Sequence, residues 1–474
     1  MRYSYVIDGL SIRREIQIAM GQSSRFLKAG AVVLACTLLS ASNGAPRTVS
    51  RGELPDILLV SVDTLRADHL SIYGYERKTS PRIDRLMAGG AIFDQARTVE
   101  PLTAPALVSM LTSMAPHEHG ASRNGLRMRP GLPSLPKALE AAGYDTAAIL
   151  GNWTLRDKLT HLGEHFQEYD LVLNRRRWFG LVRGEATAED LNERTLAFLE
   201  SRASAAEDRK PLFLWVHYTE PHAPYRLWRD DADSIGLPQN NLTKLDRYDS
   251  EIRFVDRQIG DLLDSLARGD HLQDPIVVFT SDHGESLGEH NYWGHGRNLY
   301  EPGLHIPMSI TWQGHVKPMR LPAPALNTDL APTLLSLAGL PVPERFSGYD
   351  WAPVLVGGGE QPLDRVTTYQ AHKGAVISNH SSEMARQSGL LEVGRIEGPD
   401  KEVFRIGNNR RRLFNLSRDP QETRNLSSRR EEPTESLVGW MESVYDSLLT
   451  FEDMPPETLD QASIEQLKSL GYVD

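Results

Sequence analysis

The chain has 474 residues, of which 40% are hydrophobic and 24% are charged, an ordinary composition for a soluble globular protein that can bury a large core. The formal net charge is -11 and the sequence contains no basic stripe, so we expect no nucleic-acid partner. The negative net charge does not exclude an anionic substrate, because a bound metal ion dominates the electrostatic field at its own site.

The first 45 residues have the layout of a secretory signal peptide. Arg25 and Lys28 precede the apolar run at 29–41, and small residues follow it. The run is too short for a comfortable membrane span, so we expect no stable span in the mature chain. The polar stretch before Met20 fits this layout poorly, and a translation start at Met20 fits it better. An uncleaved anchoring helix is the alternative.

The single cysteine, Cys36, lies inside this segment. A mature chain without it has no disulfide and no thiol chemistry. Residues 33–36 loosely resemble a lipoprotein-processing site, so lipidation at Cys36 is an alternative, although the apolar residues after Cys36 fit it badly. We therefore predict a secreted or periplasmic protein.

Strand-like and helix-like patterns alternate over residues 50–345. Such alternation is typical of an α/β domain, in which helices cover both faces of a mostly parallel sheet. The strand-like runs begin near residues 56, 145, 211, 275 and 305, and the helix-like patterns cover about 80–89, 134–144, 188–200, 248–267 and 328–340.

The pattern changes over residues 346–474, where we predict a smaller α+β subdomain. Short β-like runs lie at 375–378 and 390–396, and a helix is expected around 434–451. The arginine run at 410–412 is expected to lie on a solvated face.

Acidic and imidazole groups follow two of the predicted strands. Asp63 comes after the strand that begins at Asp56, and Asp282 and His283 come after the strand that begins at Pro275. The carboxyl ends of parallel strands share one edge of the sheet, which is where ligands bind. We therefore predict one divalent metal ion there. The mixed oxygen and nitrogen ligands favour Mn²⁺ or Zn²⁺, with Ca²⁺ as the third candidate.

Thr103 is the candidate nucleophile. It opens the helical pattern TAPALVSMLTS, in which Pro105 fits the first turn. A hydroxyl there lies in the positive field of the helix N-terminus and can bind the metal directly, and both effects favour the alkoxide. Taken alone, a threonine at this place is more commonly a helix cap.

Several motifs, in the same order along the chain, resemble the sulfatase family of the alkaline-phosphatase superfamily. The resemblance covers roughly residues 54–474 and implies an alkaline-phosphatase-like sandwich with a metal at the carboxyl edge of its sheet. It also implies ester hydrolysis or transfer at sulfur or phosphorus through a covalent intermediate. The motifs are DTLRADHLSIYGY, TAPALVSMLTS with HEHG, VHYTEPHAPY, TSDHGESLGEH with LYEPGLHIP, LFNLSRDPQETRNL and LKSLGYVD.

The resemblance also implies roles for residues outside the metal set. His222 matches the substrate-binding histidine of the family, and His222 and His295 are candidates to bind the transferred group or to protonate the leaving oxygen. His119 matches the histidine of the HG turn. Arg66 would neutralise substrate charge or, alternatively, pair with a neighbouring carboxylate. For each histidine, a structural role is the alternative.

The chain departs from the family pattern at the nucleophile. The sulfatases carry a cysteine or serine that is oxidised to formylglycine, whereas Thr103 cannot yield the aldehyde. Ala106 and Leu107 replace the Ser and Arg of that motif, and Thr64 replaces the second of two aspartates. His283 stands where many calcium-dependent members have asparagine. The substrate-binding lysine that usually precedes the LYE motif is also absent.

The set Asp63, Thr103, Asp282 and His283 resembles the single-metal site of the superfamily's phosphoethanolamine and lipoteichoic-acid transferases, which use a threonine nucleophile. Those enzymes carry transmembrane helices ahead of the catalytic domain, which this sequence does not show. We therefore predict a metal-dependent hydrolase that cleaves a sulfate or phosphate ester of a small molecule or glycan. The alternative is a catalytically impaired family member that binds anionic glycans or sulfated ligands.

Overall fold

The computed structural model describes residues 54–173, 175–177, 182–205, 209–374, 389–428 and 432–449. The predicted export segment at 1–45, with Met20 and Cys36, lies outside these residues, as does the β-like run at 375–378. Across the described part of the chain, no helix has both the length and the apolar character that crossing a membrane requires.

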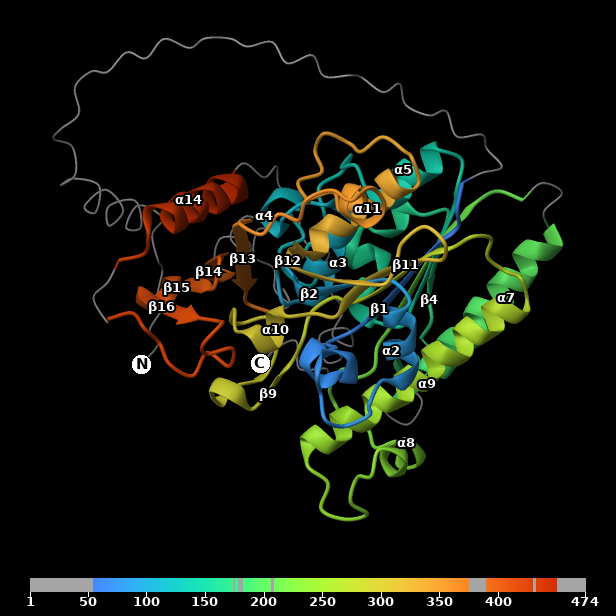
Figure 1. Ribbon diagram of the computed structural model, residues 1–474, viewed down its shortest axis with the longest axis horizontal. Helices are drawn as coiled ribbons and strands as arrows, with labels where there is room; N and C mark the ends of the chain where they lie inside the picture. The colour runs from blue at the N-terminus through green and yellow to red at the C-terminus, as the bar shows by residue number, and fades with distance from the viewer. Residues whose placement is uncertain are drawn as a thin grey trace, which may run out of the picture. The chain divides into compact units, whose positions relative to one another are not determined.

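Within the described residues, eight strands form one central sheet, which confirms the predicted α/β class (Figure 1). All pairings are parallel except those of β11, which runs antiparallel to β8 and β2. The strand order is β12 (Met319–Leu326), β2 (Ala91–Arg97), β11 (Met308–Trp312), β8 (Ile276–Ser281), β1 (Ile57–Val62), β7 (Leu212–Tyr218), β3 (Asp145–Leu150) and β4 (Glu168–Leu171).

Helices cover both faces of this sheet, as the alternating pattern predicts (Figure 1). The apolar residues of β1 alternate between the two cores: Leu59 packs into one and Leu58 into the other. One core is covered by α3 (Thr103–Thr112), α5 (Leu135–Ala141), α11 (Leu330–Leu337) and α12 (Ala352–Gly357), and the other by α2 (Pro81–Ala88), α7 (Ala188–Ala205) and α9 (Lys244–Arg268).

The long helix α9 begins four residues before the predicted position 248, because a capping box fixes its start. Thr243 Oγ1 accepts a hydrogen bond from the backbone N–H of Asp246, and Asp246 Oδ2 accepts one from the backbone N–H of Thr243. The short elements on the connections are α4 (Pro116–His119), α6 (Asp157–Thr160), α8 (Arg229–Ser234), α10 (Glu301–Leu304), β5 (Arg175–Arg177), β6 (Val182–Gly184), β9 (Ser286–Leu287) and β10 (Trp293–Gly294).

Among the described C-terminal residues, four strands form a separate antiparallel sheet. These strands are β13 (Thr367–His372), β14 (Leu390–Glu397), β15 (Asp400–Arg405) and β16 (Arg410–Asn415), and α14 (Glu435–Leu449) packs on β14. The predicted boundary between residues 345 and 346 stays a prediction. The expectation that the arginine run is solvated is wrong for Arg412, which is buried and pairs with Glu392 at 2.5 Å.

A buried ion cluster joins the two sheets, and its lysine is expected to contribute strongly to stability. Lys401 Nζ lies 2.8 Å from both Glu301 and Glu422, and Arg97 lies 2.8 Å from Glu301. Removing the ammonium leaves two buried carboxylates with too little positive charge. We expect Lys401→Met to lower the free energy of unfolding by about 3–5 kcal/mol in urea denaturation.

The matched control is Lys137→Met on α5. Lys137 pairs with Glu140 at 2.9 Å, but its side chain is 45% exposed, so we expect a change below about 1 kcal/mol. If the two substitutions lower the free energy of unfolding equally, the buried cluster does not stabilise the fold more than an exposed ion pair does.

Candidate functional site

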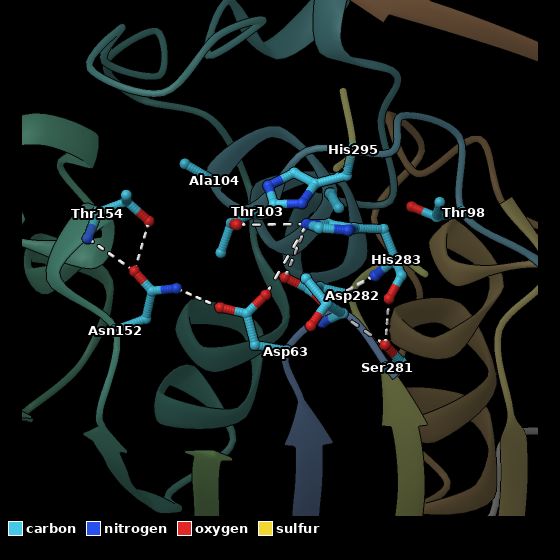
Figure 2. A network of polar contacts seen from close by, with 12 residues as sticks. Asp63, Thr98, Thr103, Ala104, Asn152, Thr154, Ser281, Asp282, His283 and His295 are labelled. Carbon is cyan, nitrogen blue, oxygen red and sulfur yellow. Dashed lines mark hydrogen bonds and ion pairs between the residues drawn. The ribbon is translucent and has the colours of Figure 1, made fainter. Parts of the chain in front are cut away.

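Three adjacent strands bring acidic and imidazole groups to one edge of the central sheet. β1 lies between β7 and β8, and Ser61 is in register with His217 on one side and with Thr280 on the other. Asp63 and Asp282 each follow their strand by one residue and are fully buried. The structure therefore brings together, at the carboxyl edge, side chains that are more than two hundred residues apart in sequence (Figure 2).

Each of the two aspartates has one oxygen held by donors and one without a hydrogen-bond partner. Asp282 Oδ1 accepts hydrogen bonds from the backbone N–H of Thr64 at 3.1 Å and of His283 at 2.7 Å, whereas Asp282 Oδ2 accepts none. Asp63 Oδ2 accepts a hydrogen bond from Asn152, whereas Asp63 Oδ1 accepts none. Two buried carboxylate oxygens are thus left over for a ligand.

His217 is a third potential metal ligand, which the sequence analysis missed. Its Nδ1 lies 2.8 Å from Ser61 Oγ, and its Nε2 is buried without a hydrogen-bond partner, 4.0 Å from Asp63 Oδ2. One ligand atom from each of Asp63, His217 and Asp282 lies within 4.8 Å of the others. In the sequence, the signal that could have identified it is a histidine near the end of the apolar run that forms β7.

Thr103 and His283 complete the predicted set beside this cluster. Thr103 is the fully buried first residue of α3, and its Oγ1 lies 3.3 Å from His283 Nε2 (Figure 2). His283 Nδ1 lies 2.9 Å from the carbonyl oxygen of Gly284, which can only accept, so the proton is on Nδ1 and Nε2 carries the lone pair. Nε2 also lies 3.4 Å from Asp282 and 3.9 Å from Asp63.

Two further imidazoles, both predicted, continue from His283: His295 lies next to it, and His222 lies next to His295. The ring centroid of His295 lies 4.4 Å from that of His283 and 5.3 Å from that of His222. His222 Nδ1 lies 2.7 Å from the carbonyl oxygen of Ala223, so its Nε2 also carries the lone pair. His295 Nδ1 lies instead 3.1 Å from the carboxyl group of Glu285, with which it can exchange a proton.

Burial and mutual repulsion set the protonation of these groups in the metal-free protein. Burial raises the pKa of Asp63 well above its usual value, and the charge of Asp282 adds to this effect. Burial lowers the pKa of His217, His222 and His295 to about 4. Neutral imidazoles with buried lone pairs, next to carboxylate oxygens without donors, are a donor set that fits a divalent cation.

Glu285 gives a pH test of this electrostatic description. Burial raises its pKa to about 7, so the stability that it contributes in the folded state is present at acidic pH and is lost as the pH rises through 7. We expect Glu285→Gln to remove this dependence. Between pH 5 and pH 8, in the presence of chelator, the free energy of unfolding of wild type should fall by up to about 3 kcal/mol relative to that of the variant, as measured by urea unfolding.

The control for this comparison is Glu164→Gln, because the Glu164 side chain is 67% exposed. That variant should follow the pH dependence of wild type. If Glu285→Gln and wild type also have parallel pH profiles, Glu285 does not titrate in this range.

The two predicted substrate-binding residues, His119 and Arg66, are engaged in other contacts. His119 Nε2 lies 2.9 Å from Ser109 Oγ, and its Nδ1 accepts the backbone N–H of Ala121. The Arg66 guanidinium pairs with Asp68 at 2.7 Å and Glu289 at 2.6 Å, the alternative expected from the sequence. Substrate binding by either residue stays a prediction.

Asn124 was also missed by the sequence analysis. Its Oδ1 accepts the backbone N–H of Ala104 at 3.0 Å and so holds the first turn of the helix that carries Thr103. No spacing or strand pattern marks it in the sequence, because it lies in a loop after α4.

Comparisons with known proteins identify the family of this chain. The Sulfatase family model matches residues 55–340, and the model for the C-terminal part of N-sulphoglucosamine sulphohydrolase matches residues 288–443. The choline-sulfatase of Rhizobium meliloti is 26% identical over 450 residues, which cover 81% of this chain and 84% of that protein.

Solved structures show the same fold. A protein in complex with its substrate D-glucosamine-2-N,6-O-disulfate has a TM-score of 0.65 at 20% identity, covering 86% of this chain and 100% of that one. The phosphonate monoester hydrolase of Agrobacterium radiobacter has a TM-score of 0.62 at 19% identity, covering 84% and 96%. The chain belongs to the sulfatase family of hydrolases.

Proposed function

We propose that this protein hydrolyses a sulfate or phosphate ester by transferring the anionic group to Thr103 before water releases it. The observation that carries this proposal is the position of Thr103 Oγ1, fully buried at the start of α3 and 3.3 Å from His283 Nε2. A hydroxyl in the field of a helix N-terminus is favoured as the alkoxide.

We propose that one divalent metal ion is held by Asp63, Asp282 and His283, with Thr103 as a further ligand and His217 added from the structure. The fit rests on the buried Asp63 Oδ1, Asp282 Oδ2 and His217 Nε2 atoms, which have no hydrogen-bond partner. When bound, such an ion lowers the pKa of a coordinated hydroxyl and neutralises the charge of the ester. Mn²⁺ or Zn²⁺ suits this nitrogen and oxygen set better than Ca²⁺.

The side chains of this site account for both halves of the reaction. The oxygen of the ionised Thr103 forms a bond to phosphorus or sulfur as the bond to the ester oxygen breaks. His295 gives the leaving alcohol a proton from its Nε2 while its Nδ1 takes the proton of Glu285, whose pKa burial raises to about 7. A water molecule then attacks the same phosphorus or sulfur atom. His222 Nε2, which carries a lone pair, takes one proton of that water as Thr103 leaves again in its ionised form. That proton then returns to the neighbouring pair of His295 and Glu285, which restores the starting state.

Among the two ester classes, we favour phosphate esters. Formylglycine releases sulfate by breaking a carbon–oxygen bond of its hydrate, and threonine has no second hydroxyl for that step. The threonine ester must therefore be cleaved at sulfur or phosphorus. One relative is a choline-sulfatase, and one protein with a similar structure was solved with D-glucosamine-2-N,6-O-disulfate bound. We therefore propose a small-molecule or glycan ester as the substrate.

The test is hydrolysis of p-nitrophenyl sulfate, p-nitrophenyl phosphate and bis-p-nitrophenyl phosphate by the metal-reconstituted protein. Phosphoester turnover that is absent in Thr103→Ala supports the proposal, and sulfate turnover would overturn the preference for phosphorus. Tight metal binding with no turnover of any ester would favour the alternative, an impaired member that binds anionic glycans or sulfated ligands.

We also propose that the protein is secreted or periplasmic. This rests on the basic, apolar and small-residue order of the first 45 residues. N-terminal sequencing of the exported protein tests it, and a mature protein that keeps residues 29–41 in the cytoplasm would contradict it.

A further inference from the structure

An amide whose own orientation is fixed holds Asp63. Asn152 Nδ2 donates a hydrogen bond to Asp63 Oδ2, and Asn152 Oδ1 accepts from the backbone N–H and the hydroxyl of Thr154, both at 2.8 Å (Figure 2). A backbone N–H can only donate, so the amide oxygen must face Thr154 and the NH2 group must face Asp63. The backbone N–H of Thr154 therefore fixes which end of the amide faces Asp63.

The segment that carries this amide is buried and directly follows a strand of the central sheet. Asn152 follows β3 by two residues and caps a single 3₁₀ turn, Trp153–Leu155, whose side chains are all buried. β3 is paired with β7, which is paired with β1, the strand that ends just before Asp63. Asn152 and Asp63 are thus placed by neighbouring parts of one sheet, and the amide has little freedom to turn away.

The contact fixes the orientation in which Asp63 presents an oxygen to the ligand cluster. With Oδ2 engaged by Asn152, Oδ1 is the buried oxygen that has no hydrogen-bond partner and lies 3.9 Å from His283 Nε2. Without the amide, the plane of the carboxylate is free to rotate, and neither oxygen is held in the direction of the cluster. Groups that orient metal ligands in this way reduce the disorder of the metal-free site.

We propose that Asn152 is a positioning residue for the metal site: it holds Asp63 with Oδ1 directed at the cation and thereby raises the affinity for a divalent ion. This inference rests on the metal site of the proposed function. Hydrogen-bond partners of metal ligands typically contribute about 10- to 100-fold in metal affinity, and we expect a loss of that size when the amide is removed.

The experiment measures metal binding directly, by equilibrium dialysis of Mn²⁺ and Zn²⁺ against chelator-treated protein. Asn152→Leu, which keeps the size of the side chain, should raise the dissociation constant about 10- to 100-fold. Thr154→Val, which keeps the backbone donor and loses the hydroxyl, should raise it about 2- to 5-fold. Asn192→Leu removes another buried amide, on α7, and should leave metal affinity unchanged.

Asp63→Asn separates failure of this inference from failure of the proposed metal site. If wild type and Asp63→Asn bind both metals equally, the metal site itself is wrong. If Asp63→Asn loses the metal while Asn152→Leu binds it like wild type, only the positioning role is overturned. Should Asn152→Leu not fold, Thr154→Val carries the test, and an unchanged dissociation constant in that variant overturns the role.

Discussion

Replacing Thr103 with alanine is expected to lower kcat for ester hydrolysis by about 10⁴- to 10⁶-fold, the loss typical when a covalent nucleophile is removed. The physical reason is that the substitution removes the hydroxyl that lies 3.3 Å from His283 Nε2 at the start of α3. Steady-state kinetics on the best p-nitrophenyl ester, with saturating metal, measures the effect.

Thr103→Ser is the matched control for this substitution. Serine keeps the hydroxyl and loses only a methyl group, so we expect it to retain activity within about 100-fold of wild type. A Thr103→Ala variant with wild-type kcat would show that water, or another side chain, attacks the ester directly.

The second large effect is expected for Asp282→Asn. The Oδ1 contacts to the backbone of Thr64 and His283 can persist in the amide, but the charge that faces the cation is lost. We expect loss of measurable metal binding and a fall in kcat/KM of about 10³-fold, equal to about 4 kcal/mol of transition-state stabilisation. Metal dialysis and kinetics on the same preparation measure both quantities.

The same variant should be more stable than metal-free wild type, which separates loss of a ligand from damage to the fold. Asp282 is one cause of the raised pKa of Asp63, so the two carboxylates repel each other when no cation is bound. Removing one charge should raise the free energy of unfolding by about 1 kcal/mol or more at neutral pH in chelator. A less stable variant would contradict the repulsion.

The sequence was enough to predict most of the fold, because its apolar runs are long and well separated. The strands β1, β3, β7 and β8 and the helices α2, α5 and α7 lie where their patterns predicted them. The antiparallel direction of β11 was not predictable, since an apolar run reads the same in either direction. Arg412 shows a similar limit: charge alone does not reveal that Glu392 will pair with it in a buried position.

In the candidate site, residues that directly follow a predicted strand could be recognised from the sequence. Residues whose role depends on which strands lie side by side could not. Asp63, Asp282 and His283 follow apolar runs, and Thr103 opens a helical pattern, so each carries a local signal. His217 was missed because its place beside Ser61 depends on the pairing of two strands 156 positions apart. Asn152 was missed for the same reason, since its partner Asp63 becomes its neighbour only through the sheet.

The most direct test of the account is to look for the covalent intermediate on Thr103. Wild type and His222→Ala, which should release the group more slowly, are acid-quenched during turnover of the best phosphoester and digested for peptide mass spectrometry. We expect one added phosphoryl group on the peptide that contains Thr103, at the hydroxyl, and none in Thr103→Ala. Turnover in both enzymes with Thr103 unmodified, or with the group on another residue, would contradict it.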